Sequence, residues 1–134
     1  MSGRYAYLDT SAFVKLVVTE PESAALLRSM RRWPALVSCT LLRAEAIRAL
    51  NRSGHRDQVG VARRLFGAVH LLQVDEPLLD RAGELSPEML RTLDAVHLAA
   101  ALSLGSELAV LVTYDQRLAG AARAMGLEVA SPGS

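Results

Sequence analysis

The amino-acid sequence predicts an α/β fold with a parallel central sheet. Apolar residues make up 51% of the 134 residues but aromatic residues only 4%, so the core must consist of Leu, Val and Ala. That mixture is expected for helices packed on a sheet. Runs of β-forming residues alternate with helical patterns, which implies right-handed crossovers and a sheet covered on both faces. The length matches a single domain over residues 1–134, without a linker or repeat.

The chain up to residue 74 is expected to form three strands and four helices. The strands are predicted at 4–8, 35–39 and 70–74, and the helices at 11–18, 21–31, 40–54 and 56–67. Pro21 suits a first helical turn, and Thr40 and Gly54 are the residue types that begin and end the third helix.

The remaining residues continue the alternation. Asp75 is expected to cap a helix over "EPLLDRAGEL", and a loop around "SPEML" follows. The alanine-rich segment "LDAVHLAAALSLG" predicts a buried helix that Gly105 ends, because it is apolar nearly all round. "ELAVLVTYD" is the clearest strand, followed by a helix over 116–125 and a short strand at 128–130.

Composition and hydropathy predict a cytoplasmic protein with no membrane segment. Cys39 is the only cysteine, which excludes an internal disulfide framework and suits a reducing compartment. The first residues, "MSGRYAYL", lack the apolar core of a secretion signal, and the most apolar window is shorter than a membrane span. A net charge of +1 does not by itself predict a nucleic-acid partner. Fourteen of the 15 basic residues are arginine. This excess is explained either by binding of phosphate groups, which the planar guanidinium suits, or by the codon usage of a GC-rich genome.

Two aspartates follow the ends of predicted strands. Asp9 stands after the strand in "YAYLDTSAF", and Asp115 after the strand in "AVLVTYD". The carboxyl ends of parallel strands meet at one edge of the sheet, where ligands bind at the point of strand-order reversal. Each aspartate could instead be the N-cap of the helix that follows it.

Two further acids lie on predicted helices among apolar residues. Glu45 shares a helix face with apolar side chains, although a partly exposed ion pair with Arg48 would also explain it. Asp94 opens the buried helix, where N-capping is an alternative role. His97, one turn later, is interpreted as a hydrogen-bonded core histidine rather than as a ligand.

These four carboxylates could converge on one pocket. Carboxylates within a few ångströms of one another repel unless protons or a metal ion neutralise them. An all-oxygen set of ligands suits a hard cation such as Mg²⁺, and no cluster of His and Cys residues indicates zinc. A bound divalent cation would activate water and offset charge on a phosphoryl group.

Four segments of the chain resemble the motifs of PIN-domain ribonucleases, particularly the VapC-type toxins. They are "YLDTSAFVKL", "LLRAEAIRAL", "LRTLDAVHLAAAL" and "LVTYDQRLAGAARAMGLEV", in the order found in that family. The resemblance implies a PIN-like three-layer α/β/α sandwich with a central parallel sheet of four to five strands. It also implies a catalytic Mg²⁺ or Mn²⁺ site formed by Asp9, Glu45, Asp94 and Asp115, with Ser11 and Thr113 at small hydroxyl positions nearby.

The implied activity is metal-dependent hydrolysis of RNA by an endoribonuclease, the toxin of a toxin–antitoxin pair. The implied partners are an RNA substrate, a cognate antitoxin and a second copy of the chain. Arg48 and Arg52 either hold the RNA backbone beside the cut or are solvated surface residues. Two other functions stay open. One is a small-molecule phosphatase with Asp9 as nucleophile, although Ser11 stands where its second aspartate is expected. The other is a catalytically silent domain that binds RNA or protein.

Overall fold

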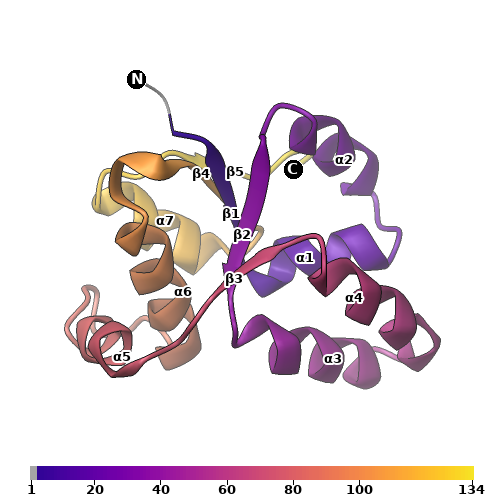
Figure 1. Ribbon diagram of the computed structural model, residues 1–134, viewed down its shortest axis with the longest axis horizontal. Helices are drawn as coiled ribbons and strands as arrows, with labels where there is room; N and C mark the ends of the chain where they lie inside the picture. The colour runs from indigo at the N-terminus through magenta and orange to yellow at the C-terminus, as the bar shows by residue number, and fades with distance from the viewer. Residues whose placement is uncertain (1–2) are drawn as a thin grey trace.

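A five-stranded, all-parallel sheet forms the middle layer of the protein in the computed structural model, which describes residues 3–134 (Figure 1). The strands lie side by side in the order β3-β2-β1-β4-β5. They span β1 (Tyr5–Leu8), β2 (Ala35–Cys39), β3 (His70–Leu72), β4 (Leu108–Val112) and β5 (Val129–Ala130). The predicted parallel sheet is therefore confirmed.

Helices cover both faces of this sheet (Figure 1). One face carries α1 (Thr10–Val17), α2 (Ser23–Met30), α3 (Leu42–Arg52) and α4 (Val59–Phe66), and the other carries α5 (Glu76–Gly83), α6 (Thr92–Ser103) and α7 (Gln116–Ala124). Side chains alternate along β1, because Ala6 and Leu8 pack toward α1 and α2, whereas Tyr7 packs toward α6. None of the helices within residues 3–134 is long and apolar enough to span a membrane.

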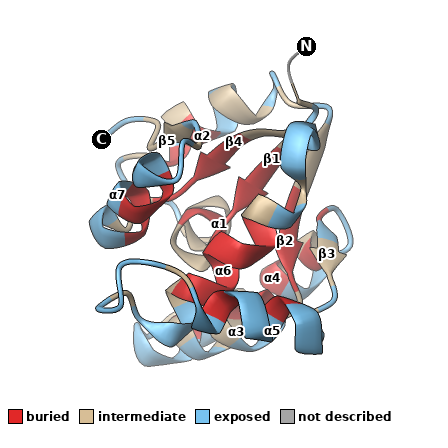
Figure 2. Ribbon diagram, turned by 90° about the vertical axis from the view of Figure 1, so that its left-hand side faces the viewer, coloured by how far each residue is buried: buried red, intermediate tan, exposed pale blue. Residues whose placement is uncertain are grey.

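Helix α6 is the most deeply buried helix of the fold (Figure 2). Seven consecutive residues, Ala95 to Ala101, are buried, so all sides of the helix contact protein. This confirms the buried helix predicted from its apolar sequence. The consequence for chemistry is that a polar residue in this helix must find its partner inside the protein.

The helix boundaries differ from the predictions in a few places. Thr40 is not the cap of α3, because its hydroxyl accepts a hydrogen bond from the backbone N–H of Val74 at 3.2 Å and so joins the ends of β2 and β3. The predicted helix over 56–67 divides into a short 3₁₀ turn, Arg56–Gln58, and α4. The predicted roles of Gly54, with φ of 81°, and of Asp75, which caps α5, are confirmed.

The strand order reverses between β1 and β4, and this fixes a position at the carboxyl edge of the sheet. From β1 the chain builds outward through β2 and β3 on one side, and β4 and β5 are added on the other. The reversal between β1 and β4 is the place where open parallel sheets bind ligands. Asp9 directly follows β1, and Thr113 directly follows β4, at this edge.

Candidate active site

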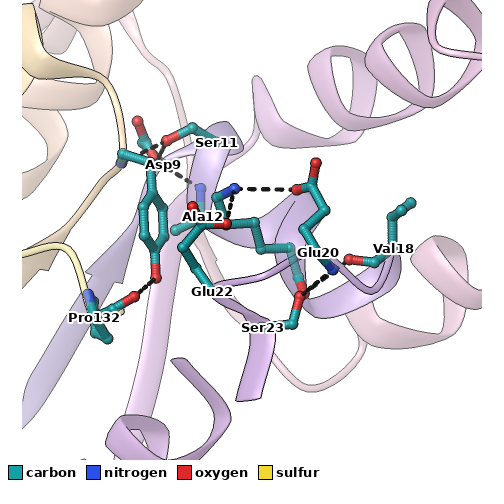
Figure 3. Close-up of polar contacts among 10 residues, drawn as sticks. Asp9, Ser11, Ala12, Val18, Glu20, Glu22, Ser23 and Pro132 are labelled. Carbon is teal, nitrogen blue, oxygen red and sulfur yellow. Dashed lines mark hydrogen bonds and ion pairs between the residues drawn. The ribbon is translucent and has the colours of Figure 1, made fainter. Parts of the chain in front are cut away.

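Asp9 is a buried carboxylate held by three hydrogen bonds. Its side chain is only 3% exposed. The Oδ1 atom accepts from the Ser11 hydroxyl at 2.7 Å and from the Ala12 N–H at 3.0 Å (Figure 3), and Oδ2 accepts from the Thr113 hydroxyl at 2.5 Å. Burial raises the pKa of Asp9, and these hydrogen bonds partly offset that rise. Asp9 therefore caps α1, as the alternative interpretation predicted, and also lies at the carboxyl edge of the sheet, where the strand order reverses.

The hydroxyls of Ser11 and Thr113 connect Asp9 to the end of β4. Ser11 Oγ accepts a hydrogen bond from the Tyr114 N–H at 2.9 Å, and Thr113 Oγ1 accepts one from the Asp115 N–H at 3.0 Å. Each hydroxyl thus donates to Asp9 and accepts from the backbone that leads to Asp115. The orientation of the Asp9 carboxylate is fixed by two segments that are far apart in the sequence.

Asp115 is the N-cap of α7. Its Oδ1 accepts hydrogen bonds from the backbone N–H groups of Arg117 at 2.9 Å and Leu118 at 3.1 Å. Capping is thus its local role, as the alternative predicted. Within residues 3–134 no hydrogen bond reaches its Oδ2, which leaves that oxygen available to a ligand.

Asp94 has no hydrogen bond from its side chain within the described part of the chain, in contrast to Asp9. It lies in the first turn of α6 and is not the N-cap, a position that Arg91 occupies, so the capping alternative is wrong. Burial raises the pKa of the half-buried Asp94, and the negative charges of Asp115 and Asp9 raise it further. Asp94 is therefore close enough to both Asp9 and Asp115 to be repelled by each of them.

Glu45 is bound to a histidine rather than to an arginine. Its Oε1 accepts hydrogen bonds from the Thr10 hydroxyl at 2.7 Å and from His97 Nε2 at 2.6 Å. Burial alone would raise the pKa of Glu45, but the hydrogen bond and charge of His97 outweigh it and lower the pKa. The predicted alternative, an ion pair with Arg48, is wrong, because the ion pair that Glu45 makes within residues 3–134 is with His97.

His97 is buried in α6 and bonded through both ring nitrogens. Its Nδ1 lies 2.8 Å from the Tyr7 hydroxyl and 3.8 Å from Cys39 Sγ. Burial would lower the pKa of His97, but the hydrogen bonds and charges of Cys39 and Glu45 raise it to about 10. The interpretation as a hydrogen-bonded core histidine is confirmed. The contacts of His97 with Glu45 and Thr10 were not predicted, although a lone polar residue in an apolar helix must find a partner inside the protein.

Arg48 and Arg52 lie one and two turns beyond Glu45 on α3, and both side chains are exposed. No ion pair joins either arginine to an acid within residues 3–134. Their contact with a substrate stays a prediction.

The donor set fits a hard divalent cation. Asp9, Asp94 and Asp115 offer carboxylate oxygens only, and the repulsion of Asp94 by the other two is the electrostatic condition that a cation relieves. No group of three or more His, Cys, Asp or Glu side chains in the described residues is placed to hold an ion by itself. Mg²⁺ needs no such cage, because it commonly takes one or two carboxylates and keeps several waters. Hydrated Mg²⁺ or Mn²⁺ therefore suits this edge better than zinc.

The sequence profile of the PIN domain family matches residues 6–124. Ribonuclease VapC46 of Mycobacterium tuberculosis is 49% identical over 126 residues, which cover 94% of this chain and 96% of the relative.

Solved structures share the fold. The Mycobacterium tuberculosis toxin VapC20, described as cleaving the sarcin–ricin loop, superposes with a TM-score of 0.72 at 18% identity over 87% of this chain and 94% of its own. Rickettsia felis VapBC2, solved on a DNA fragment from its promoter, gives a TM-score of 0.68 at 16% identity over 94% and 97%. The profile match and the close relative together show that this chain belongs to the PIN-domain family and, within it, to the VapC-type ribonucleases.

Proposed function

We propose that this protein is a metal-dependent endoribonuclease that hydrolyses RNA phosphodiester bonds and acts as the toxin of a toxin–antitoxin pair. The observation that carries the proposal is the group of Asp9, Asp94 and Asp115, in which the charges of Asp9, after β1, and Asp115, after β4, both act on Asp94. Asp94 in particular has a raised pKa and no described hydrogen bond, as expected of a side chain kept for a ligand.

Each proposed site residue has a separate task. Asp9 and Asp94 would hold Mg²⁺ or Mn²⁺, with Glu45 and Asp115 completing the site. When bound, such an ion lowers the pKa of its water and offsets negative charge on the phosphoryl group. Ser11 and Thr113 hold the Asp9 oxygens in place through their hydroxyl groups. Asp115 keeps Oδ2 free while Oδ1 caps α7, so it can orient water at the same edge.

The relatives support the biological role. The closely similar Mycobacterium tuberculosis protein is named a ribonuclease, and a structural neighbour from Klebsiella pneumoniae is described as a toxin–antitoxin complex. A cognate antitoxin is accordingly the proposed protein partner, and RNA the substrate. A single domain over residues 1–134, a homodimer and a cytoplasmic location stay predictions from the sequence.

The phosphatase alternative has less support than the ribonuclease. Such a phosphatase needs a second aspartate two residues after the nucleophile, but Ser11 stands there and its hydroxyl donates a hydrogen bond to Asp9 Oδ1 at 2.7 Å. A phosphoenzyme trapped on Asp9 would reinstate the phosphatase.

The direct test compares the purified wild type with Asp94→Asn on a labelled single-stranded RNA in Mg²⁺. We expect the variant to cleave about a hundredfold more slowly or worse, because several kcal/mol of charge stabilisation are lost. Asp75→Asn is the matched control, since Asp75 caps α5 and asparagine caps equally well. Equal cleavage by wild type and Asp94→Asn, or full activity in EDTA, would overturn the proposal.

The toxin role needs a separate assay in cells. Induced expression of the wild type should arrest growth, whereas Asp94→Asn should not. The proposed antitoxin, to be sought among small proteins encoded beside this gene, should restore growth when it is co-expressed and should copurify with the chain. Growth arrest by both proteins would show that the toxicity does not come from the acidic site.

A further inference from the structure

We propose that His97 is a positioning residue that fixes the carboxylate of Glu45, so that one oxygen of Glu45 is held by the protein and the other stays free for the divalent ion. This inference rests on the proposed function, since it assigns Glu45 to the same metal site. It adds a residue that contacts neither substrate nor metal in the proposed site.

The imidazole of His97 is fixed before it reaches Glu45. Its side chain is 2% exposed, and Nδ1 lies 2.8 Å from the hydroxyl of Tyr7, which is itself fully buried in the central strand β1. The two rings meet edge to face, with centroids 5.8 Å apart. The ring is therefore anchored from the sheet on one side and directs Nε2 outward on the other.

Glu45 receives its two described hydrogen bonds on the same oxygen. His97 Nε2 lies 2.6 Å and Thr10 Oγ1 lies 2.7 Å from Oε1, and no hydrogen bond to Oε2 is found within residues 3–134. A glutamate side chain loses considerable rotamer freedom when it is held in one position. Two donors on Oε1 supply that restraint and leave Oε2 unoccupied by the protein.

The pair also lies in the right part of the molecule. Thr10 directly follows Asp9, so the oxygen that it contacts is beside the carboxyl edge of β1. The Glu45 side chain is 19% exposed although its partner is buried, which places the pair between the core and the surface. A purely structural pair would not need to reach solvent at the edge where Asp9 lies.

Helix α6 carries both the proposed metal ligand Asp94 and the positioning residue His97. Asp94 and His97 are three residues apart, so they lie on one side of the helix, about one turn from each other. One rigid element therefore presents a proposed metal ligand and the residue that orients a second one. Partners that orient metal ligands in this way typically change metal affinity or activity by about 10- to 100-fold when they are replaced.

The test measures Mn²⁺ binding by calorimetry in the full-length protein, without RNA. His97→Asn can still bond near Tyr7 but is too short to reach Glu45, whereas His97→Gln places an amide N–H near the position of Nε2. We expect Mn²⁺ affinity to fall about tenfold in His97→Asn and to be largely restored in His97→Gln. His70→Asn, an exposed histidine on β3, is the control and should not change the affinity.

A double-mutant cycle separates positioning from general destabilisation. If His97 acts through Glu45, adding His97→Asn to Glu45→Gln should weaken Mn²⁺ binding by less than about twofold beyond Glu45→Gln alone. Thr10→Val tests the same oxygen without altering the buried ring, and its affinity should fall in the same direction. This variant keeps the test decisive where a His97 variant does not fold.

The possible failures are distinct. Additive losses in the cycle, unchanged affinity in His97→Asn, or unchanged affinity in Thr10→Val where the His97 variants do not fold, would overturn the positioning role while leaving the ribonuclease intact. A wild type that cleaves no RNA and binds no Mn²⁺ would overturn the proposed function and this inference together.

Discussion

Glu45 and Asp94 occupy similar places on opposite faces of the sheet but have opposite electrostatics. Each lies in the first turn of a helix, α3 or α6. Glu45 accepts two hydrogen bonds, and His97 lowers its pKa, whereas Asp94 accepts none in the described chain, and burial with the charges of Asp115 and Asp9 raises its pKa. One acid is stabilised by the protein, and the other is left for a ligand.

The opposite pKa shifts of Glu45 and Asp94 come from the partner of Glu45, His97, and not from the local sequence around either acid. Both acids stand among apolar residues, but His97 is 52 positions away from Glu45 and is brought to it by the packing of α6 on the sheet. The comparison therefore predicts that neutralising one acid lowers the stability of the fold and neutralising the other raises it.

Removing the partner of Glu45 should have the largest effect on stability. His97→Leu leaves the buried Tyr7 hydroxyl unpaired and Glu45 with Thr10 alone, so we expect a loss of about 2–4 kcal/mol in the free energy of unfolding. Urea denaturation measures it. A loss below about 0.5 kcal/mol, within the usual range for surface substitutions, would mean that the pair does not stabilise the fold.

The stability from His97 should depend on pH. Its folded-state pKa of about 10 is above the ordinary value of 6.5, so its contribution is complete below pH 6.5 and is lost as the pH rises toward 10. Denaturation of wild type and His97→Leu at several pH values should show the difference between them shrinking across that window. Cys39 also faces the imidazole, so repeating the series in Cys39→Ala separates the pH-dependent stability that is due to Cys39 from that due to Glu45. A difference that grows with pH would contradict the ion pair.

Neutralising the unpaired acid should raise stability by a smaller amount. Asp94→Asn removes the repulsion from Asp9 and Asp115, and because Asp94 is partly solvated we expect a gain of at most about 1 kcal/mol. The raised pKa means that the penalty is present at neutral pH and disappears in acid, as Asp94 takes up a proton. Thermal denaturation of this variant beside Asp75→Asn measures the gain. A variant less stable than wild type would show that Asp94 is satisfied in a way that the structure does not indicate.

The arginines of α3 should give the smallest effect, one confined to RNA binding. Arg48→Gln and Arg52→Gln should leave the fold unchanged and weaken RNA binding severalfold. If each contacts one phosphate of a single strand, each substitution lowers the salt slope by about 0.7. Arg123→Gln, in the last turn of α7, is the control. Unchanged affinity and slope would identify Arg48 and Arg52 as solvated surface residues.

The sequence predicted most of the architecture, because the alternation of strand and helix patterns is a local signal. β2 begins and ends where its apolar run does, at Ala35 and Cys39. The predicted cap at Thr40 is wrong because the hydroxyl of a threonine before a helix can accept from that helix or from another segment. Here tertiary packing brings the backbone N–H of Val74 to the Thr40 hydroxyl.

The candidate site was less predictable, since its connections are long-range. The sequence offered two alternative roles for Asp9, helix capping and a position in the site. In the structure Asp9 caps α1 and also lies at the carboxyl edge of the sheet. The contact of His97 with Glu45 depends on which side of α6 faces the sheet, and an all-round apolar helix gives no periodic signal for that orientation.

The central position of β1 has a consequence during synthesis. Thr113, which fixes the Asp9 carboxylate, lies 104 residues further along the chain, and β4, the neighbour of β1 that Thr113 follows, is made late. Contacts of such large sequence separation cannot form until both segments have been made. A polypeptide that ends anywhere in the first hundred codons thus lacks the assembled acidic edge. The nuclease site can therefore form only when the chain is almost complete.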